Sequence, residues 1–477
     1  MKDKKIVGII AAAVGGVLLL LVAVLLLDFF IPGGNGHTHD FKELLSYDNE
    51  KHILACKCGK KEEAEHEYGE GEVLTEATCQ KGGTDKYVCK LCPNFKLENT
   101  DKTDEHSYDE GICLYCKDIV PTDEMYFEFT LLEDGTYSVA QKKVSLYPRN
   151  IRIPESYKGK PVTAISESGF EDNSRIYSVY IPDSLKEIGY SAFYECVNLE
   201  YIRIGENVKS IPRFAFGACR NLKEIIMPDT LESIEAYAFS NCLILYKVDL
   251  PSSLNFIGHS AFANCKQLET MDMSDTKLTT FEESAFYACI RLQTVVLPET
   301  VTFIGTKAFS ECTSLEQANI PTALQYLGDS AFENCKKLES KIVLPDTISY
   351  LGKRAFASCT NLAEVTLPSN IVVMQENIFR NCSSLVIPVL PETLVEIHYG
   401  VFYNCYKMPE YLPVSLKSIG NYAFYDVENA GDVKYDGTTS DFMSVELGIS
   451  VFSDTDTVIV CTDGEIEAGK NSDAAIG

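Results

Sequence analysis

The sequence predicts an α/β repeat solenoid, a rod or arc closed by β-rich caps and preceded by a transmembrane segment and a small Cys/His-rich module. The solenoid is predicted from an Ala-Phe-x-x-Cys motif that recurs every 22 to 24 residues, with a short apolar strand pattern between copies. A fixed period of this length is typical of stacked coils, in which each unit buries its apolar face only against its neighbours. An uncharged N-terminal run and a cluster of Cys and His predict the other two parts.

The beginning of the chain predicts a membrane anchor. A basic stub, residues 1–5, precedes an uncharged run over residues 6–27, which as a helix can cross about 30 Å of hydrocarbon. The lysines of the stub keep the N-terminus cytoplasmic and place the bulk of the protein outside the cell in a single pass. The alternative is a cleaved signal peptide, which leaves a secreted protein, although this run is longer than the usual apolar core.

Residues 37–120 hold five of the seven His and seven of the eighteen Cys. Cys-x-x-Cys pairs with a His ahead of them favour structural zinc, because thiolates and imidazoles together complete a tetrahedron. Disulfides are the alternative for an exported protein, but seven thiols cannot all pair. No other cofactor is indicated, and the acidic stretches 60–67 and 97–110 are expected to be solvated loops. The candidate ligands are His66, Cys79, Cys89 and Cys92 as one set, and His106, Cys113 and Cys116 as another.

Residues 124–165 are predicted to cap the N-terminal end of the stack. The stretch 126–132, a turn at Gly135 and the stretch 136–139 predict a β-hairpin, and a further strand is expected at residues 151–154. An end unit is required because the open face of the last coil would otherwise expose apolar side chains and unpaired backbone.

Residues 166–425 are predicted to form the coils. Each coil has an alternating strand ending in Pro, and then an Ile-Gly pair at which Gly is expected to take a positive φ. Ala-Phe is expected on a short helix or 3₁₀ turn, with the Phe filling the coil. The repeated Phe residues are Phe170, Phe193, Phe216, Phe239, Phe262, Phe286, Phe309, Phe332, Phe356, Phe379, Phe402 and Phe424.

A column of ten Cys follows the same period. In parallel coils the Cβ atoms of equivalent residues point the same way and stay about 4.8 Å apart, beyond the 3.5–4.5 Å usual for disulfides. We therefore expect buried, unbonded thiols that act as small apolar side chains. The column consists of Cys196, Cys219, Cys242, Cys265, Cys289, Cys312, Cys335, Cys359, Cys382 and Cys405.

The outward strand positions are the candidate binding face. They mix charged, hydroxyl and aliphatic groups, and the aliphatic and Tyr residues favour a protein-binding surface over an idle sheet whose residues only reflect β-propensity. Ser178, Val343, Ile387 and Val389 are expected to point outward as well. The candidate ligand-binding residues are Tyr180, Tyr201, Arg203, Glu224, Ile226, Lys247, Asp249, Asp272, Val296 and Asn319.

The net charge and the motifs of the sequence exclude some classes of partner and activity. The net charge of −27 argues against a nucleic-acid partner and favours a self-repelling monomer. No Ser/His/Asp set or pair of carboxylates is fixed by spacing, so no enzyme activity is expected. Residues 426–468 predict a C-terminal cap made of a strand, a polar helix and a last strand with Cys461 buried, and the polar tail 469–477 is expected to be disordered.

The repeat Ile-Gly-x-x-Ala-Phe-x-x-Cys-x-x-Leu-x-x-[Val/Ile]-x-[Ile/Leu]-Pro resembles the BspA-like class of leucine-rich repeat over about residues 151–425. Asn173 and Val427 replace Cys in the end copies. The Cys/His module resembles those found ahead of repeat domains in many Firmicutes surface proteins. The resemblance implies a non-catalytic cell-surface protein that mediates adhesion or interaction with an extracellular protein or glycan. A structural envelope protein with the solenoid as a spacer is the alternative.

Overall fold

The structure is a computed structural model that describes residues 43–47, 51–55, 61–65, 67–75, 84–90, 95–99, 108–109, 112–113, 121–427, 431–452 and 457–468. The stub 1–5, the apolar run 6–27 and the tail 469–477 lie outside these residues. Within them, no helix is long and apolar enough to span a membrane. The chain divides into two compact units between residues 105 and 106.

The first unit contains two three-stranded antiparallel sheets. Lys61–Glu65 pairs with Lys51–Ala55 although the acidic stretch 60–67 was expected to be a loop, and its residues are mostly exposed. The predicted module 37–120 crosses the boundary between the units, because β7 (Tyr108–Asp109) and β8 (Ile112–Cys113) belong to the second. The sheets are β1 (Glu43–Tyr47), β2 (Lys51–Ala55) and β3 (Lys61–Glu65), and β4 (Tyr68–Thr75), β5 (Thr84–Cys89) and β6 (Phe95–Asn99).

The N-terminal cap of the second unit confirms the predicted hairpin. A 3₁₀ turn, η1 (Glu124–Tyr126), leads into β9 (Phe127–Leu131), which pairs antiparallel with β10 (Tyr137–Gln141) across a turn where Gly135 has φ +84°. A second hairpin joins β12 (Ser156–Tyr157) to β13 (Lys160–Ile165), which runs parallel to β10. Because β13 also pairs with a strand of the first full coil, the sheet of the cap continues into the solenoid.

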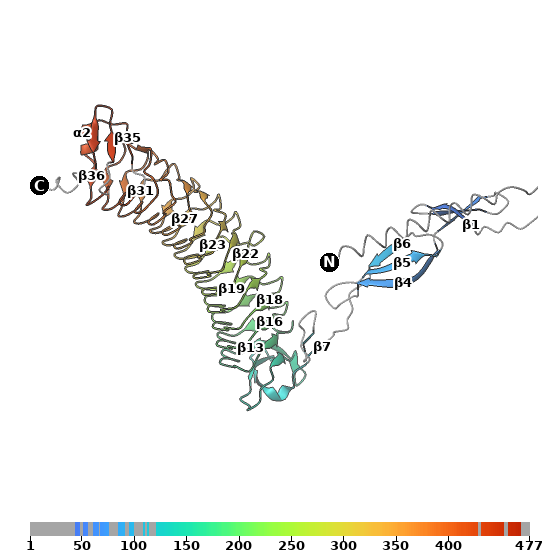
Figure 1. The fold of residues 1–477 in the computed structure, drawn as a ribbon. Coiled ribbons are helices and arrows are strands. Elements are labelled where there is room, and N and C mark those ends of the chain that lie inside the picture. The colour runs from blue at the N-terminus through green and yellow to red at the C-terminus, as the bar shows by residue number, and fades with distance from the viewer. Residues whose placement is uncertain are drawn as a thin grey trace, which may run out of the picture. The chain divides into compact units, whose positions relative to one another are not determined.

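Two series of short parallel strands run along the curved stack of coils (Figure 1). The first series is β11 (Asn150–Arg152), β14 (Ser178–Tyr180), β16 (Tyr201–Arg203), β18 (Glu224–Ile226), β20 (Lys247–Val248), β22 (Thr270–Asp272), β24 (Thr294–Val296), β26 (Gln317–Ala318), β28 (Lys341–Val343), β30 (Glu364–Thr366) and β33 (Tyr411–Leu412). The second series follows β13 as β15 (Glu187–Ile188), β17 (Ser210–Ile211), β19 (Ser233–Ile234), β21 (Phe256–Ile257), β23 (Thr280–Phe281), β25 (Phe303–Ile304), β27 (Tyr326–Leu327), β29 (Tyr350–Leu351), β31 (Val373–Met374), β32 (Glu396–Ile397), β34 (Ser418–Ile419) and β36 (Glu446–Leu447).

The third side of each coil, which we call the turn edge, consists of the residues around the repeated Phe. The expected short helix is wrong, because these residues form tight turns, and the described coils make a β-solenoid rather than an α/β one. The residues two before and two after the Phe have positive φ, such as Ser191 (52°) and Glu195 (58°) around Phe193. Asn tolerates this left-handed backbone better than most residues, and it occupies the second of these positions at Asn241, Asn264, Asn334, Asn381 and Asn404.

The Gly of the Ile-Gly pair has a different role from the expected one. None of Gly189, Gly258, Gly305, Gly328, Gly352 and Gly420 has a positive φ. Instead, the backbone of the preceding coil passes so close that a Cβ on Gly328 would lie 2.5 Å from the nitrogen of Thr306. Gly is therefore required by close packing of backbone on backbone.

The core is continuous along the stack and contains a column of Phe rings and a column of Cys thiols, together with Leu, Ile and Val residues. From Phe170 to Phe424 each repeated Phe stacks on the next with centroids 5.0 to 5.8 Å apart, and Phe452 of the C-terminal cap adds a further ring that the period did not predict. The ten Cys are free and buried, as expected. Each Sγ donates a hydrogen bond to the backbone oxygen of the Phe one coil earlier, at 3.1 to 3.3 Å.

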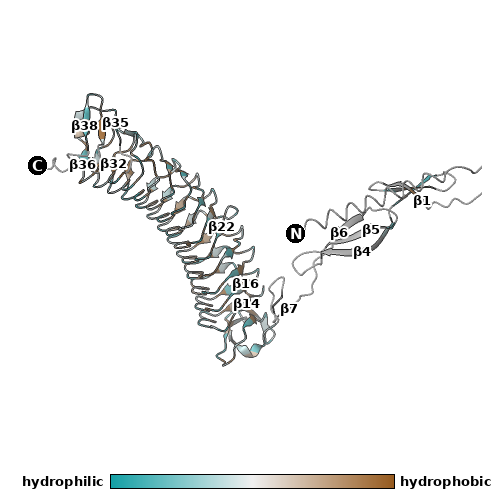
Figure 2. Cartoon of the chain, viewed as in Figure 1, coloured by the Kyte–Doolittle hydropathy of each residue, from teal (hydrophilic) through white to brown (hydrophobic). Residues whose placement is uncertain are grey.

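The C-terminal cap also has the predicted elements. β35 (Val433–Tyr435) continues the first series beside β33, and β37 (Val458–Val460) and β38 (Glu465–Glu467) complete that sheet. The helix α2 (Thr439–Met443) begins with a capping box between Thr438 and Asp441, and buries Phe442 against Tyr435. Cys461 is buried. Both hydrophilic and hydrophobic residues occur along the strands of the stack (Figure 2).

Candidate binding face

The outward positions of the first strand series, which we call the strand face, are arranged in two rows. Ser178, Tyr201, Glu224 and Lys247 are neighbours in one row, and the other row runs from Arg152 through Tyr180 and Arg203 to Ile226. Between the rows the middle residue of each strand is buried, as Val179, Ile202 and Ile225 are. The predicted alternation is therefore confirmed in β16 and β18, whereas all three residues of β14 are buried.

Tyr180 lies in its predicted row but is buried rather than open to a ligand. Its ring is held between two guanidinium groups, with Arg152 Cζ 4.4 Å and Arg203 Cζ 4.8 Å from the ring centroid. Only 8% of Tyr180 is exposed, and Ser178 on the same strand is buried as well. The sequence could not show this, because Arg152 comes from β11, which precedes the first Ala-Phe motif.

The expected outward direction of Ile387 is also wrong. Ile387 is buried, whereas Val386 and Val389 are exposed. This coil carries Pro388 within the strand pattern, and in place of a regular strand it has a single bridge from Val386 to Lys407. A one-residue change of register reverses the side of every residue in a strand.

A hollow of about 240 Å³ opens on the strand face between β18 and β20. Four predicted face residues line it: Glu224, Ile226, Lys247 and Asp249. Met227 and Leu250 are partly exposed and supply the apolar lining. A small apolar centre with a charged rim is the usual composition of a protein-binding patch.

Charge pairs cross the strand face without forming a reactive centre. Lys247 Nζ lies 2.6 Å from Asp249 Oδ2, and the hydrogen bond to that carboxylate raises the pKa of Lys247. Lys223 pairs with Glu200 at 2.7 Å in the same manner. Lys247 and Asp249 are exposed, and Lys223 and Glu200 are partly exposed. Ion pairs open to solvent contribute little to stability, so these pairs affect the surface charge more than the stability of the fold.

Two predicted face residues have structural contacts of their own. The side-chain oxygen of Asn319 accepts a hydrogen bond from the amide of Leu297 at 2.7 Å, and its nitrogen donates to the oxygen of Leu297 at 2.9 Å. Asn319 thus extends the pairing of β24 with β26. Asp272 accepts hydrogen bonds from the hydroxyl and amide of Ser274, which lower the pKa of Asp272. Val296, by contrast, is half-buried on the open face.

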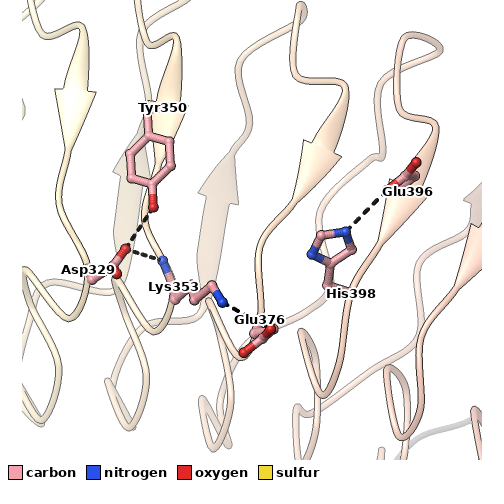
Figure 3. A network of polar contacts seen from close by, with 6 residues as sticks. All are labelled: Asp329, Tyr350, Lys353, Glu376, Glu396 and His398. Atoms are coloured by element: carbon pink, nitrogen blue, oxygen red, sulfur yellow. Dashed lines mark hydrogen bonds and ion pairs between the residues drawn. The ribbon is translucent and has the colours of Figure 1, made fainter.

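Polar side chains near the second strand series link neighbouring coils (Figure 3). The hydroxyl of Tyr350 and the amide of Lys353 both donate to Asp329 Oδ1 at 2.9 Å, and Lys353 Nζ donates to Glu376 at 3.0 Å. His398 Nε2 lies 3.2 Å from Glu396 Oε2 in a separate pair. The contacts from Asp329 through Lys353 to Glu376 in Figure 3 join successive coils and so have a structural character.

The predicted metal ligands fall mostly outside the described residues, as His66, Cys79, Cys92, His106 and Cys116 do. Cys89 ends β5 in the first unit and Cys113 ends β8 in the second. Among the residues that the structure describes, no group of three or more His, Cys, Asp or Glu is arranged to hold a metal ion.

A capped stack of parallel coils with a uniform core and a variable sheet face defines a solenoid protein of the leucine-rich repeat class. The BspA type leucine rich repeat region matches residues 147–269, 210–339 and 339–444, which together exceed half of the chain. The chain therefore belongs to the BspA-type leucine-rich repeat family, as the motif resemblance implied.

Several solved structures are similar to much of this chain. A leucine-rich repeat protein from Bacteroides ovatus is 26% identical, with a TM-score of 0.50, and the match covers 71% of this chain and 98% of that one. A leucine-rich cell surface protein from Faecalibacterium prausnitzii is 26% identical over 68% of this chain and 97% of that one, with a TM-score of 0.45. The pneumococcal vaccine antigen PcpA is 18% identical over 68% of this chain and 96% of that one, with a TM-score of 0.32. No curated protein matches the chain.

Proposed function

We propose that this chain is a cell-surface protein that binds an extracellular protein through the part of the strand face formed by β16, β18 and β20. The observation that carries the proposal is the position of Tyr201, Arg203 and Ile226 next to the hollow between β18 and β20. All three side chains are half-buried, so each offers area to a partner while its backbone is fixed in the sheet. Tyr and Arg are the residues that most often dominate binding energy at protein interfaces.

Arg203 gives this patch a preference for an acidic group. Its guanidinium lies against the ring of Tyr180, and no carboxylate of the described residues lies within 4.0 Å of it. A guanidinium that stacks on an aromatic ring keeps its in-plane donors available for a bidentate carboxylate. We therefore expect the partner to present an Asp, Glu or C-terminal carboxylate beside an apolar side chain that enters the hollow.

The test is the capture of extracellular proteins by the triple variant Tyr201→Ala, Arg203→Ala and Ile226→Ala. The matched control is Val343→Ala with Val389→Ala, two exposed aliphatic residues farther along the same face. We expect the triple variant to lose at least about tenfold in affinity for the captured partner, since hot-spot residues cost 2 kcal/mol or more when truncated. If its binding equals that of the control, the face is not the binding site and the spacer role gains support.

The proposal includes the placement of the chain. The basic stub 1–5 would stay in the cytoplasm, residues 6–27 would cross the membrane, and the solenoid would be extracellular as a monomer. Extraction of the membrane fraction with alkali should leave the full chain in the pellet, and protease added outside intact cells should digest the solenoid. Recovery of the chain in the culture medium would support cleavage and secretion instead.

The proposal also assigns a structural zinc ion to residues 37–120. The sets His66, Cys79, Cys89 and Cys92, and His106, Cys113 and Cys116, supply ligand types that zinc prefers. No catalytic role is proposed for it. Metal analysis of the purified chain before and after chelation should find zinc that the chelator removes, whereas a metal-free protein with disulfides in this segment would overturn the assignment.

A further inference from the structure

A cluster of partly exposed aromatic rings lies on the turn edge of the first coils, away from the strand face. Phe214 stacks on Tyr237 with centroids 4.7 Å apart, and Tyr190 and Tyr194 meet Phe214 edge-on at 5.9 and 5.7 Å. Tyr190 is 46% exposed, and the other three rings are half-buried. The guanidinium of Arg213 lies 5.0 Å from the Phe214 ring and 5.5 Å from the Tyr237 ring. We call these four rings the first aromatic cluster.

The backbone makes this an unexpected place for large rings. Phe214 and Tyr237 stand two residues before the repeated Phe, where φ is 57° and 60°. Left-handed backbone is costly for a bulky residue, and the next coils instead carry Ser260, Ser284, Lys307, Ser330, Arg354 and Asn377 at this position. The rings do not enter the core, which the repeated Phe fills. Their presence therefore indicates a surface role.

A second aromatic cluster, made of four Tyr rings, lies near the other end of the turn edge. Tyr403 stacks on Tyr425 at 5.5 Å, Tyr422 meets both Tyr425 and Tyr399 edge-on, and Tyr399 is 42% exposed. The guanidinium of Arg380 lies 3.9 Å from the centroid of the Tyr403 ring, as Arg213 lies over the first cluster. Tyr422 also has a positive φ, of 57°. At about 5 Å for each parallel coil, the two clusters are on the order of 40 Å apart.

The surroundings of the clusters restrict what can bind there. The amides of Phe214 and Tyr237 already donate to Ala236 and His259 of the next coil, so an added peptide strand finds no open backbone donors at these residues. Neither the hollow between β18 and β20 nor the one near residues 316–361 is lined by a cluster residue. Recognition thus depends on ring faces, Tyr hydroxyls and guanidinium groups on an open edge.

We propose that the two aromatic clusters bind one polysaccharide chain at two points. A sugar ring combines an apolar C–H face, which can lie flat on an aromatic ring, with a rim of hydroxyls that can accept hydrogen bonds from Tyr and Arg. A polymer of repeated sugars presents this same surface at intervals, which suits two like clusters on one edge. Binding at both points raises the overall affinity by about 10²- to 10⁴-fold over a single point. This surface is separate from the protein-binding part of the strand face.

The test uses the full chain, in mild detergent, on an array of bacterial and animal polysaccharides. Phe214→Ser with Tyr237→Ser removes the first cluster, and Tyr399→Ala with Tyr422→Ser removes the second. Because Ser191, Ser260, Ser284 and Ser330 occupy the equivalent position in other coils, the Ser substitutions should leave the unfolding midpoint no lower. We expect each variant to lose at least about tenfold in affinity for the bound polysaccharide, and the combined variant to lose binding.

Two controls separate this proposal from the strand-face proposal. Lys307→Ser changes the same turn position in a coil without a cluster and should leave polysaccharide binding unchanged. The triple strand-face variant should also bind the polysaccharide normally. The proposal is overturned if the unaltered chain binds no polysaccharide, or if the combined variant binds as well as the unaltered chain. It is also overturned if the cluster variants lose binding to a protein array but not to a polysaccharide.

Discussion

The turn edge and the strand face of the solenoid follow different rules. Along the turn edge, the amide of every repeated Phe from Phe170 to Phe424 donates to the next coil at 2.7 to 3.0 Å, without a break. The first strand series is interrupted after β20, after β26 and after β30. The first two interruptions come where 24-residue coils begin, and the third comes at the coil with Pro388. Changes in coil length are therefore absorbed on the strand side, where the sequence is free to vary.

This difference explains where the proposed protein-binding function can lie. The turn edge fixes the stacking through Phe, Cys, close-packed Gly and left-handed turns, so most of its residues are constrained. The strand face tolerates interruptions because the column of stacked rings already holds neighbouring coils in place. We therefore expect perturbations of the turn-edge column to unfold the protein and perturbations of the strand face to change binding.

The largest expected effect is a loss of stability at alkaline pH. Burial raises the pKa of the thiols of Cys196 and Cys382 from 9.0 to about 12, and it raises the pKa of the other eight. Above pH 9 the unfolded chain releases these protons and the folded chain does not, so stability is intact below pH 9 and falls as pH rises toward 12. Ten thiols together should cost on the order of 10 kcal/mol by pH 10.

Urea unfolding between pH 7 and 10.5 measures this loss. The free energy of unfolding falls with pH once the thiols ionise in the unfolded state. In a variant with Cys289→Ala and Cys312→Ala, this slope should be shallower by about 2.7 kcal/mol per pH unit. Because only the slopes are compared, the stability that these substitutions lose at neutral pH does not affect the result. An equal slope in both proteins would mean that the thiol column is not the source of the pH dependence.

Removal of one ring from the column should have the next largest effect. Phe286→Ala leaves a cavity between Phe262 and Phe309 and should cost about 3–5 kcal/mol. Val343→Ala on the strand face, where the side chain is 57% exposed, should change stability by less than about 0.5 kcal/mol. Thermal and urea unfolding of the two variants measure the contrast, and similar costs would erase the distinction between the regions.

A substitution at the close-packed Gly of the Ile-Gly pair should give a smaller loss of stability. In Gly328→Ala the new Cβ would meet the backbone of the preceding coil at 2.5 Å, which backbone shifts can relieve only in part, so we expect about 1–3 kcal/mol. Gly217→Ala is the comparison, because its nearest neighbour is the movable ring of Tyr194 at 3.1 Å. We expect Gly328→Ala to lower the free energy of unfolding more than Gly217→Ala does. The reverse order would contradict the close-packing role of Gly328.

The sequence predicted the periodic part of the molecule and missed what is not periodic. The Phe and Cys columns follow directly from spacing, since equivalent residues of stacked coils must share an environment. The period could not reveal Phe452, which stands 28 residues after Phe424. Nor could it distinguish a Gly needed for positive φ from a Gly needed for close approach, because both appear as the same residue at a turn.

The candidate face was predictable in outline and not in detail. Alternation placed Tyr201, Arg203 and Ile226 on the outside correctly. The burial of Tyr180 depends on Arg152, whose strand precedes the first motif, and the hollow depends on the partial exposure of Met227 and Leu250. Such contacts between neighbouring coils depend on side-chain packing that a pattern along one chain does not show.

A count of reactive thiols tests the central claim most directly, namely that the repeated residues are a closed core and carry no chemistry. The full chain is treated with a thiol reagent without reductant, first folded and then in denaturant. The ten buried cysteines of the coils should stay unreacted in the folded protein and react when it is unfolded, giving about ten additional thiols. Almost no increase on unfolding, whether because the thiols are bonded or because they already react in the folded state, would contradict the account.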